Sequence, residues 1–250
     1  MSPLGLPRAH HRRIESTNER AKALALVGAP HGTLVTADEQ TAGRGRQGRV
    51  WTAPPGGAVL MSLVLRDLEV GHALAPLAAA VAVCEAAESC APGARCRVKW
   101  PNDIWVEGRK LAGILIEGRP QEGWAVLGIG CNVATVEFPE ELRGVATSLA
   151  LEGSRAGRAS ASDRGAGDGP APEDVVGRLL EALEHWLAAL PRDVLSAWRT
   201  RDALLGSEVR WAEGAGTAAG IGDDGSLLVD TTGGRTALAA GEVHLERVRQ

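Results

Sequence analysis

Three arginines, Arg44, Arg46 and Arg49, alternate with glycines in the segment QTAGRGRQGRVW, residues 40–51. A guanidinium group offers forked donors that match phosphate oxygens, and glycine lets backbone N–H groups come close to an anion. One interpretation is a clamp that closes over a strongly anionic ligand. The other is a mobile Arg/Gly segment without a fixed ligand. Trp51 and the apolar strand after it favour the clamp, because they tie one end of the segment to the core.

Two of the three lysines in the chain fall in VKWPNDIWVEGRK, residues 98–110, although 27 residues are Lys or Arg. Lysine is a compact point charge that a planar guanidinium does not replace at a tight site. Lys99 and Asp103 flank a Pro-Asn-Asp turn, which needs no ligand to explain it. Their charges also suit a nucleotide and its Mg²⁺. Lys110 opens an apolar strand, either as a snorkelling stem or as a placed cation.

Two weaker signals have ordinary structural explanations when each is taken alone. Ser16 and Glu19 have the spacing of a capping box at a helix start, which leaves Asn18 unexplained. In GIGCN, residues 128–132, the glycines permit close approach of another group and Asn132 offers a side-chain amide. A β-bulge explains the same pattern.

The pattern of apolar residues predicts an α+β fold with a mixed sheet rather than a doubly wound one. Strands outnumber helices, and the turn at Glu107-Gly108 is typical of a hairpin. The predicted helices span residues 16–28, 72–90, 173–190 and 193–205. The predicted strands span residues 32–38, 56–66, 95–100, 103–117 (two strands) and 124–133.

The composition and the residue pattern of the sequence change twice towards the C-terminus. Residues 153–172 contain only Gly, Ala, Ser, Pro, Arg and Asp, so we predict a disordered insertion. From residue 207 onward short strands follow at regular turn spacing, which predicts a small β-barrel. We therefore divide the chain into a catalytic domain over residues 1–202 and a C-terminal barrel over residues 203–250.

Composition argues against several classes of protein. The net charge of −4 and the scarcity of Phe and Tyr, one and none, count against nucleic-acid binding. No apolar run reaches the roughly 18 residues of a membrane span, and the N-terminus lacks the apolar core of a signal peptide. The chain has no C-x-x-C pair and no phosphate-binding P-loop. We therefore expect a cytoplasmic protein with reduced thiols and no membrane partner.

Taken together, the motifs resemble one family. The order STN (residues 16–18), QTAGRGRQGRVW, KWPNDIW, GRKLAGIL and GIGCN is similar to that of the biotin–protein ligases, also called biotin–[acetyl-CoA-carboxylase] ligases. GEVHL near the C-terminus extends the resemblance into the predicted barrel. The resemblance implies an α+β catalytic domain with a mixed sheet, related to the class II synthetases, followed by an SH3-like barrel.

The resemblance also implies roles for particular residues. Those that would bind biotin, the first four at its ureido end, are Ser16, Thr17, Asn18, Gln40, Arg44, Gly45, Arg46 and Lys110. Those that would bind ATP and the adenylate are Arg46, Arg49, Trp51, Lys99, Asn102, Asp103, Lys110 and Asn132. Lys110, against the biotin carboxylate and the α-phosphate, and Arg46, on the loop over the adenylate, would be catalytic. No metal ligands are assigned.

The activity that the resemblance implies is a ligation in two steps. Biotin and ATP, with Mg²⁺, would form biotinyl-5′-AMP, and biotin would then pass to a lysine of a biotin carboxyl carrier protein. A lipoate–protein ligase or octanoyltransferase of the same fold is the nearest alternative, and a non-catalytic nucleic-acid-binding module is a more distant one. The segment before STN is too short for an N-terminal DNA-binding domain, so we expect no DNA partner.

Overall fold

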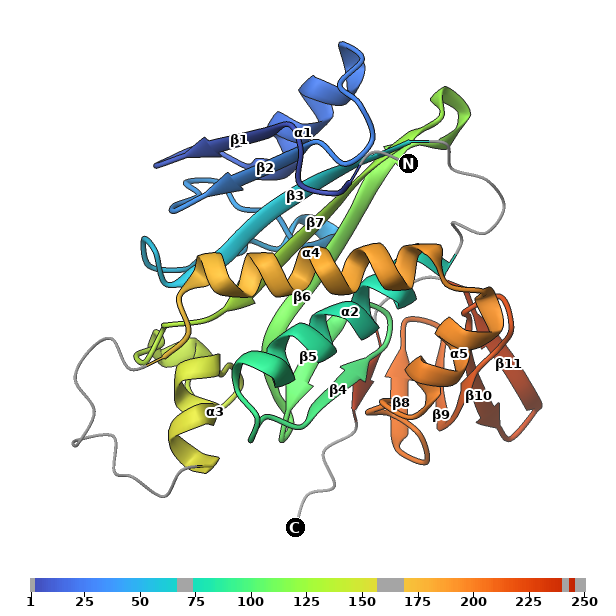
Figure 1. The fold of residues 1–250 in the computed structure, drawn as a ribbon. Coiled ribbons are helices and arrows are strands. Elements are labelled where there is room, and N and C mark those ends of the chain that lie inside the picture. The colour runs from blue at the N-terminus through green and yellow to red at the C-terminus, as the bar shows by residue number, and fades with distance from the viewer. Residues whose placement is uncertain (1–2, 67–73, 157–168, 240–242, 246–250) are drawn as a thin grey trace.

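The predicted strands of the N-terminal part form one mixed sheet (Figure 1). It is seen in a computed structural model, which describes residues 3–66, 74–156, 169–239 and 243–245. In spatial order its strands are β1 (Arg8–His11), β2 (Leu34–Ala37), β3 (Ala58–Arg66), β7 (Trp124–Asn132), β6 (Arg109–Arg119), β5 (Asp103–Val106) and β4 (Cys96–Lys99). β1 and β2 are parallel and the other neighbouring pairs are antiparallel, which confirms the α+β class and the mixed sheet.

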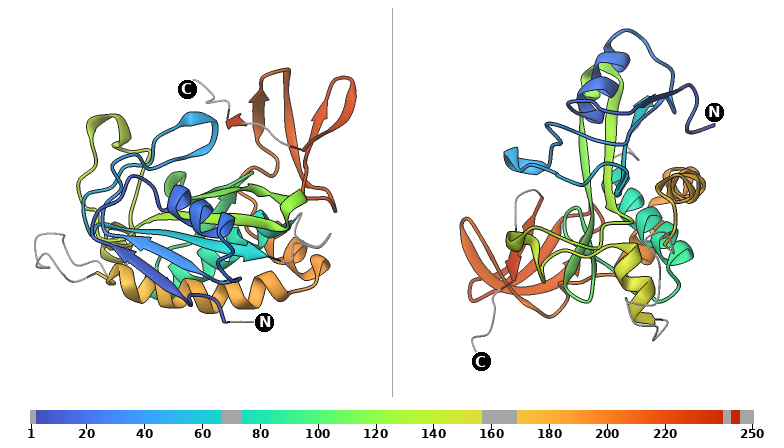
Figure 2. Two further views of the ribbon diagram at one scale, coloured as in Figure 1. Left: turned by 90° about the horizontal axis from the view of Figure 1, so that it is seen from above. Right: turned by 90° about the vertical axis from the view of Figure 1, so that its left-hand side faces the viewer.

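Helices cover the two faces of this sheet differently (Figure 2). α2 (Ala75–Cys90) and α4 (Pro172–Ala188) pack together on one face, with α5 (Pro191–Arg199) against α2. α1 (Thr17–Leu26) packs on β3 and β7 from the opposite face. Loops complete the cover on the α1 side, and α3 (Leu149–Ala156) follows one of them.

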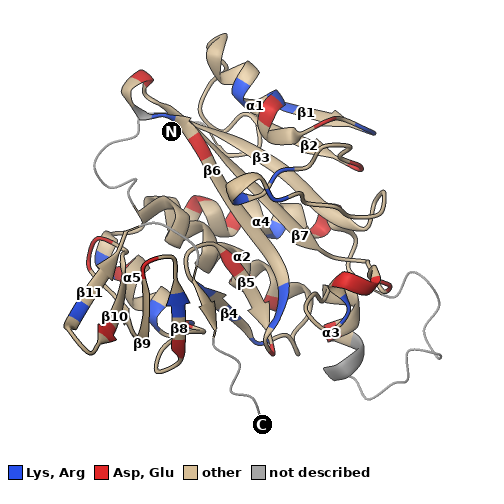
Figure 3. Cartoon of the chain, turned by 180° about the vertical axis from the view of Figure 1, so that it is seen from behind, with Lys and Arg blue, Asp and Glu red and all other residues tan. Residues whose placement is uncertain are grey.

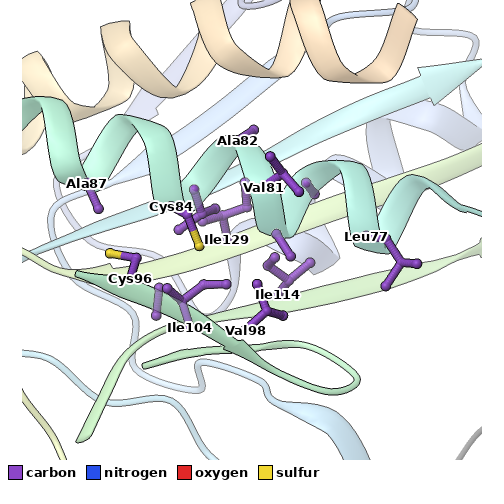
Figure 4. Packing of buried hydrophobic residues seen from close by; sticks show 14 of the residues in the cluster. Leu77, Val81, Ala82, Cys84, Ala87, Cys96, Val98, Ile104, Ile114 and Ile129 are labelled. Atoms are coloured by element: carbon purple, nitrogen blue, oxygen red, sulfur yellow. The ribbon is translucent and has the colours of Figure 1, made fainter. Parts of the chain in front are cut away.

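Strand β3 is buried on both faces, as its continuous apolar run predicts. Met61 and Leu63 belong to the large core shared with α2 and α4, whereas Val64 belongs to a smaller apolar cluster under α1. This division follows from the alternation of side chains across a strand. Figure 4 shows the α2 side of the core, to which Val81 of α2 and Ile129 of β7 both belong.

The hairpin between β5 and β6 turns at Glu107-Gly108, as predicted. Both residues have positive φ, 48° and 77°, the conformation of a two-residue type I′ turn. The resulting register places Lys110 of β6 opposite Trp105 of β5. The turn thereby fixes where Lys110 stands on the sheet.

The C-terminal strands form a second sheet, which is antiparallel. In spatial order its strands are β11 (Gly234–Leu238), β10 (Leu227–Thr231), β9 (Gly214–Ile221), β8 (Glu208–Trp211) and β12 (His244–Leu245). Val209 and Leu227 belong to the same apolar core as α2, and Trp100 Nε1 donates a hydrogen bond to the Gly225 carbonyl at 3.1 Å. The second sheet thus continues the core of the first. Two statements about this part of the chain stay predictions. One is that the second sheet closes into an SH3-like barrel, and the other is that the domain boundary lies between residues 202 and 203.

Three elements differ from the sequence prediction. Helix α5 ends at Arg199, although the sequence predicts a helix as far as residue 205. β1 is not indicated by its sequence, RAHH, because it has no apolar alternation; it forms as an edge strand held by backbone pairing to β2. α3 reaches Ala156, so residues 153–156 of the predicted insertion are helical. Leu149 and Glu152, both buried, tie the start of this helix to the protein. Residues 157–168 lie outside the described residues.

All four cysteines are free thiols. Burial raises the pKa of the Cys84 and Cys131 thiols, which is typical of unreactive core residues. Figure 4 shows Cys84 of α2 and Cys96 of β4 within the apolar core. In the described part of the chain, no helix combines the length and apolar character that crossing a membrane requires.

The hydrogen bond from the buried Trp100 to the half-buried Gly225 joins a turn after β4 to the turn before β10, and we expect Trp100→Phe to destabilise the protein. The substitution leaves the Gly225 carbonyl without its donor, which costs about 1–3 kcal/mol. Trp186→Phe is the matched control, because the Trp186 indole donates to Glu85 at the surface. The free energy of unfolding in urea checks the prediction, and equal effects of the two variants would contradict it.

Candidate active site

A cavity of about 440 Å³ opens on the α1 face of the main sheet. Figure 3 looks onto this face, with charged segments of α1 and β6 around the loop that follows β2. The predicted site residues that line the cavity are Ser16, Thr17, Asn18, Gln40, Arg44, Gly45, Arg46, Arg49, Trp51, Asn102, Asp103, Lys110 and Asn132. Lys99 instead borders a smaller crevice, which shares Arg46, Arg49 and Asp103 with the cavity. Their binding roles stay predictions, but the fold brings them together.

The STN motif forms the N-terminus of α1, and its three residues are buried. Ser16 is the N-cap, with its Oγ accepting from the Glu19 N–H at 3.4 Å. The Glu19 carboxylate pairs with neighbouring cations, so the reciprocal bond of the predicted capping box is not formed in the described structure. The motif therefore places three polar side chains at the cavity wall.

Hydrogen bonds link these side chains to the sheet. Gln40 Oε1 accepts from Thr17 N at 2.8 Å and from Thr17 Oγ1 at 3.1 Å. Ser62 of β3 has its Oγ 2.8 Å from Thr17 Oγ1 and 2.6 Å from Asn18 Oδ1. Sequence reasoning missed Ser62, although one polar residue inside the apolar run AVLMSLVLR is a signal that points to it. The network holds each polar group in one direction.

Asn18 lies directly against the sheet. Its Nδ2 donates to Glu117 Oε2 at 3.0 Å. A Cβ at Gly128 would lie 2.1 Å from Asn18 Oδ1, so β7 needs a glycine where the helix terminus approaches. This contact explains Asn18 and the first glycine of GIGCN together, which the sequence alone did not.

The Arg/Gly loop, residues 43–51, is a short irregular hairpin. The Gly45 N–H donates to the Arg49 carbonyl at 2.7 Å, and a 3₁₀ turn, η1 (Arg46–Gly48), forms the tip. The Trp51 ring lies on β7, where a Cβ at Gly130 would come within 2.6 Å of it. Trp51 thus ties the end of the loop to the sheet, as the sequence predicts.

Arg44 faces protein carboxylates. It forms ion pairs with Glu19 and with Glu117, whose Oε1 is 3.8 Å from Arg44 Nη2. The hydrogen bond from Lys22 and the proximity of Arg44 lower the pKa of the Glu19 carboxyl. The sequence expectation treats the three arginines of the loop alike, as an anion clamp. In the structure, helix α1 and strand β6 supply carboxylates that already balance the charge of Arg44.

The other two arginines of the loop border the crevice beside the Pro-Asn-Asp turn. Arg46 Nη1 donates to Asn102 Oδ1 at 3.4 Å, and Arg49 and Lys99 line the same crevice. Lys99 Nζ lies 5.3 Å from the centre of the Trp105 ring. The crevice thus gathers three cationic side chains, whose N–H donors match the oxygens of a phosphate.

Lys110 points into the cavity as a placed cation. Its Nζ is 2.7 Å from Asp103 Oδ1 and 5.7 Å from the centre of the Trp51 ring. A Cβ at Gly113 would lie 3.4 Å from the same Nζ. Of the two interpretations of Lys110, the placed cation fits this geometry, because the ammonium has a fixed partner inside the site.

The segment that follows β7 closes one side of the cavity. It pairs with β6: the Lys110 N–H donates to the Val145 carbonyl at 2.8 Å, and the Thr147 N–H donates to the Lys110 carbonyl at 2.9 Å. Asn132 Nδ2 donates to the Thr147 carbonyl at 3.0 Å. The buried Glu152 carboxylate accepts a hydrogen bond from Thr147 Oγ1 and so fixes this segment to the start of α3. Asn132 therefore supports the wall of the cavity.

The apolar part of the wall was not foreseen. Its residues include Met61, Trp105, Leu115, Phe138, Leu142 and Val145. Trp105 and Leu115 end the motifs KWPNDIW and GRKLAGIL without a role of their own there, and the other four residues belong to no motif. Residues 134–148 show no regular pattern from which a role follows. Phe138, the single Phe of the chain, lies in this segment and lines the cavity.

The lining of the cavity thus changes along β7, from neutral polar groups at one end to a cation further on. Gly128 lies under Asn18 and Gly130 lies under Trp51, so the polar cluster and the Lys110 ammonium follow each other along one strand. The arrangement suits a ligand with a polar head, an apolar body and an anionic end beside a polyanion. In the described residues, no three His, Cys, Asp or Glu side chains gather as a metal site.

Comparison with known proteins agrees with this geometry. Residues 11–133 match the biotin/lipoate A/B protein ligase family. The bifunctional ligase/repressor BirA of Bacillus subtilis is 34% identical over 94% of this chain and 73% of its own length. A biotin–[acetyl-CoA-carboxylase] ligase of Paracoccus denitrificans is 35% identical over 92% of this chain and 97% of its own.

A solved structure has the same fold over nearly the whole chain. The biotin protein ligase from Aquifex aeolicus, in complex with biotin and ATP, superposes with a TM-score of 0.77 at 27% identity. The superposition covers 96% of this chain and 98% of that one. These relatives confirm the family that the motifs predict. The chain belongs to the biotin/lipoate A/B protein ligase family, among the biotin–protein ligases.

Proposed function

We propose that this ligase joins biotin and ATP to form biotinyl-5′-AMP and then transfers the biotinyl group to a lysine of a biotin carboxyl carrier protein. The observation that carries the proposal is the graded cavity, with hydroxyl and amide groups beside Asn18 and a placed ammonium at Lys110. The Aquifex aeolicus relative, solved with biotin and ATP, supports the same pair of substrates.

The polar cluster suits the ureido ring of biotin. This ring offers one carbonyl acceptor and two N–H donors, while Ser16, Thr17, Asn18 and Gln40 carry groups that both donate and accept. These side chains are already ordered by their bonds to Ser62 and to one another. A site built from ordered polar groups strongly rejects analogues that leave those groups unpaired.

In the first step a carboxylate oxygen of biotin attacks the α-phosphorus of ATP. The new O–P bond replaces the bond to the β-phosphate oxygen, and pyrophosphate leaves. Two anions must be held in contact, so placed cations lower the barrier. We assign Lys110, oriented by Asp103, to the carboxylate and the α-phosphate, and Arg46, Arg49 and Lys99 to the phosphates.

In the second step the amine of the carrier lysine attacks the carbonyl carbon of the mixed anhydride. An amide bond forms, the C–O bond to AMP breaks and the amine loses a proton. Water competes for the anhydride until the carrier arrives. The Arg/Gly loop over the cavity would exclude it, with Arg46 holding the adenylate.

We expect Mg²⁺ to enter with ATP. This ion is usually held by substrate phosphates together with one or two carboxylates and several waters. Asp103 is the acidic side chain among the described residues that line the cavity, so it is the carboxylate that fits this role. The ion would share the negative charge of the phosphates. We place the reaction in the cytoplasm, in keeping with the thiols predicted to be reduced.

The direct test is incubation of the protein with biotin, Mg-ATP and a carrier domain, followed by mass spectrometry of the carrier. One biotinyl group should be added to one lysine, and omission of ATP should abolish the addition. A parallel incubation with lipoate tests the alternative substrate. Modification with lipoate but not with biotin would overturn the proposal.

We expect Lys110→Ala to lower the rate of adenylate formation about 10²–10³-fold, the loss typical when one placed electrostatic group is removed from a transition state. Pyrophosphate release in the presence of biotin and ATP measures the rate, and circular dichroism checks the fold. Arg119→Ala removes an exposed cation from the far end of β6 and should behave like the wild type. Near-normal pyrophosphate release by Lys110→Ala would refute the assigned role.

We expect Arg46→Gly to form the adenylate but to release it about tenfold faster or more, because the loss of one charge-assisted contact costs at least that factor. The measurement follows the adenylate that stays bound after rapid desalting. Arg235→Gly, in the C-terminal sheet, is the control. A release rate equal to that of the wild type would rule Arg46 out as a clamp.

A further inference from the structure

Glu117 lies where three parts of the site meet. It stands on β6 and is reached by α1 through Asn18 and Lys22, and by the Arg/Gly loop through Arg44. The distances are 3.0 Å to Asn18 Nδ2, 3.4 Å to Lys22 Nζ and 3.8 Å to Arg44 Nη2. Neither the motifs nor the family resemblance drew attention to this residue, and it does not line the cavity itself.

The two oxygens of Glu117 have different partners. Oε2 accepts from the Asn18 amide, whereas Oε1 faces the two cations. The Glu117 side chain is 24% exposed, compared with 45% for Glu19, so solvent screens its interactions less. One carboxylate therefore contacts both the polar cluster of the cavity and the loop that covers it.

The hydrogen bond from Asn18 to Glu117 sets which atom of the Asn18 amide faces the cavity. An asparagine amide can present its oxygen or its nitrogen, and neighbouring groups select between the two orientations. Glu117 is an acceptor, so it holds the nitrogen, and the Ser62 hydroxyl lies 2.6 Å from the oxygen. With both contacts in place, the amide is locked in one orientation at the polar end of the cavity.

We propose that Glu117 is a positioning residue that couples the polar end of the biotin site to closure of the Arg/Gly loop. By holding Asn18 with one oxygen and Arg44 with the other, it makes binding of the ureido head and seating of the loop cooperate. Arg44 then acts as a latch on Glu117 and Glu19, while Arg46 acts on the adenylate. The inference rests on the proposed function, because it assigns the polar cluster to biotin.

A purely structural Glu117 would change stability without changing how substrate binding responds to salt or to Arg44. The Glu117–Arg44 pair is partly exposed, so salt screens it. If the pair holds the loop closed, release of the adenylate by the wild type speeds up with ionic strength. Glu117→Gln keeps the shape of the side chain and removes the charge, so it should weaken that dependence to the part that the Arg44–Glu19 pair contributes.

The experiment compares the wild type, Glu117→Gln, Arg44→Gln and their double variant, with Glu122→Gln as the matched control. Glu122 is an exposed glutamate beside the end of β6, paired with Arg119 away from the cavity. The readouts are KM for biotin and kcat in the pyrophosphate assay, and the rate of adenylate release at low and high salt. Thermal unfolding of each variant reports the fold.

We expect Glu117→Gln to raise KM for biotin about tenfold with kcat nearly unchanged, since one charge-assisted hydrogen bond to Asn18 is weakened. Adenylate release should be faster at low salt and should depend on salt less than in the wild type, because only the Arg44–Glu19 pair remains to be screened. The double variant should release the adenylate no faster than the faster single variant, because both substitutions open the same latch. Glu122→Gln should match the wild type.

Additive effects of the two substitutions, or an unchanged salt dependence in Glu117→Gln, would overturn the coupling. If Glu117→Gln unfolds, Glu117→Asp keeps the charge but shortens the side chain, and it should raise KM for biotin while retaining the salt dependence. An unchanged KM in that variant would also overturn the inference. A wild type that forms no adenylate from biotin would instead refute the proposed function, so the two failures are distinguishable.

Discussion

A lysine ammonium held between a carboxylate and an indole ring is the interaction on which the rest of the site depends. Lys110 Nζ lies 2.7 Å from Asp103 Oδ1 and 5.7 Å from the centre of the Trp51 ring. A lysine stem has several rotatable bonds, and ordering it costs conformational entropy that its partners must offset. Once fixed, the cation can stabilise charge that develops between a carboxylate and a phosphate without reorganising at the moment of reaction.

The Trp51 ring reaches Lys110 because strand β7 carries glycines on its cavity face. At Gly128 the space is taken by Asn18, and at Gly130 by the ring of Trp51. Larger residues at either position would push α1 or the Arg/Gly loop away from the sheet. The same strand remains buried on its other face, where Ile129 packs with α2. One strand therefore supplies core on one side and room for the site on the other.

Features that depend on neighbours in the sequence were predictable, and features that depend on distant residues were not. The N-cap at Ser16 and the hairpin turn at Glu107-Gly108 follow from local rules, and both are confirmed. Ser62 and Glu117 escaped notice because their roles come from the register of β3, β7 and β6 against α1. The partners of Arg44 were not predictable for the same reason. Glu19 of α1 and Glu117 of β6 come close to Arg44 only in the folded chain.

The kinds of charged side chain also differ between the two ends of the site. Around the polar cluster, Lys22 and Arg44 are balanced by Glu19 and Glu117. Around the crevice, three cations from the loop and from β4 gather beside Asp103. A neutral ureido head needs hydrogen bonds but no net charge, whereas a polyphosphate needs cations. The loop serves both ends because it crosses the cavity, so its first arginine meets carboxylates and its last two face the crevice. Under the proposed function, an acidic protein would bind a polyanion with two arginines of one short hairpin and one lysine of β4.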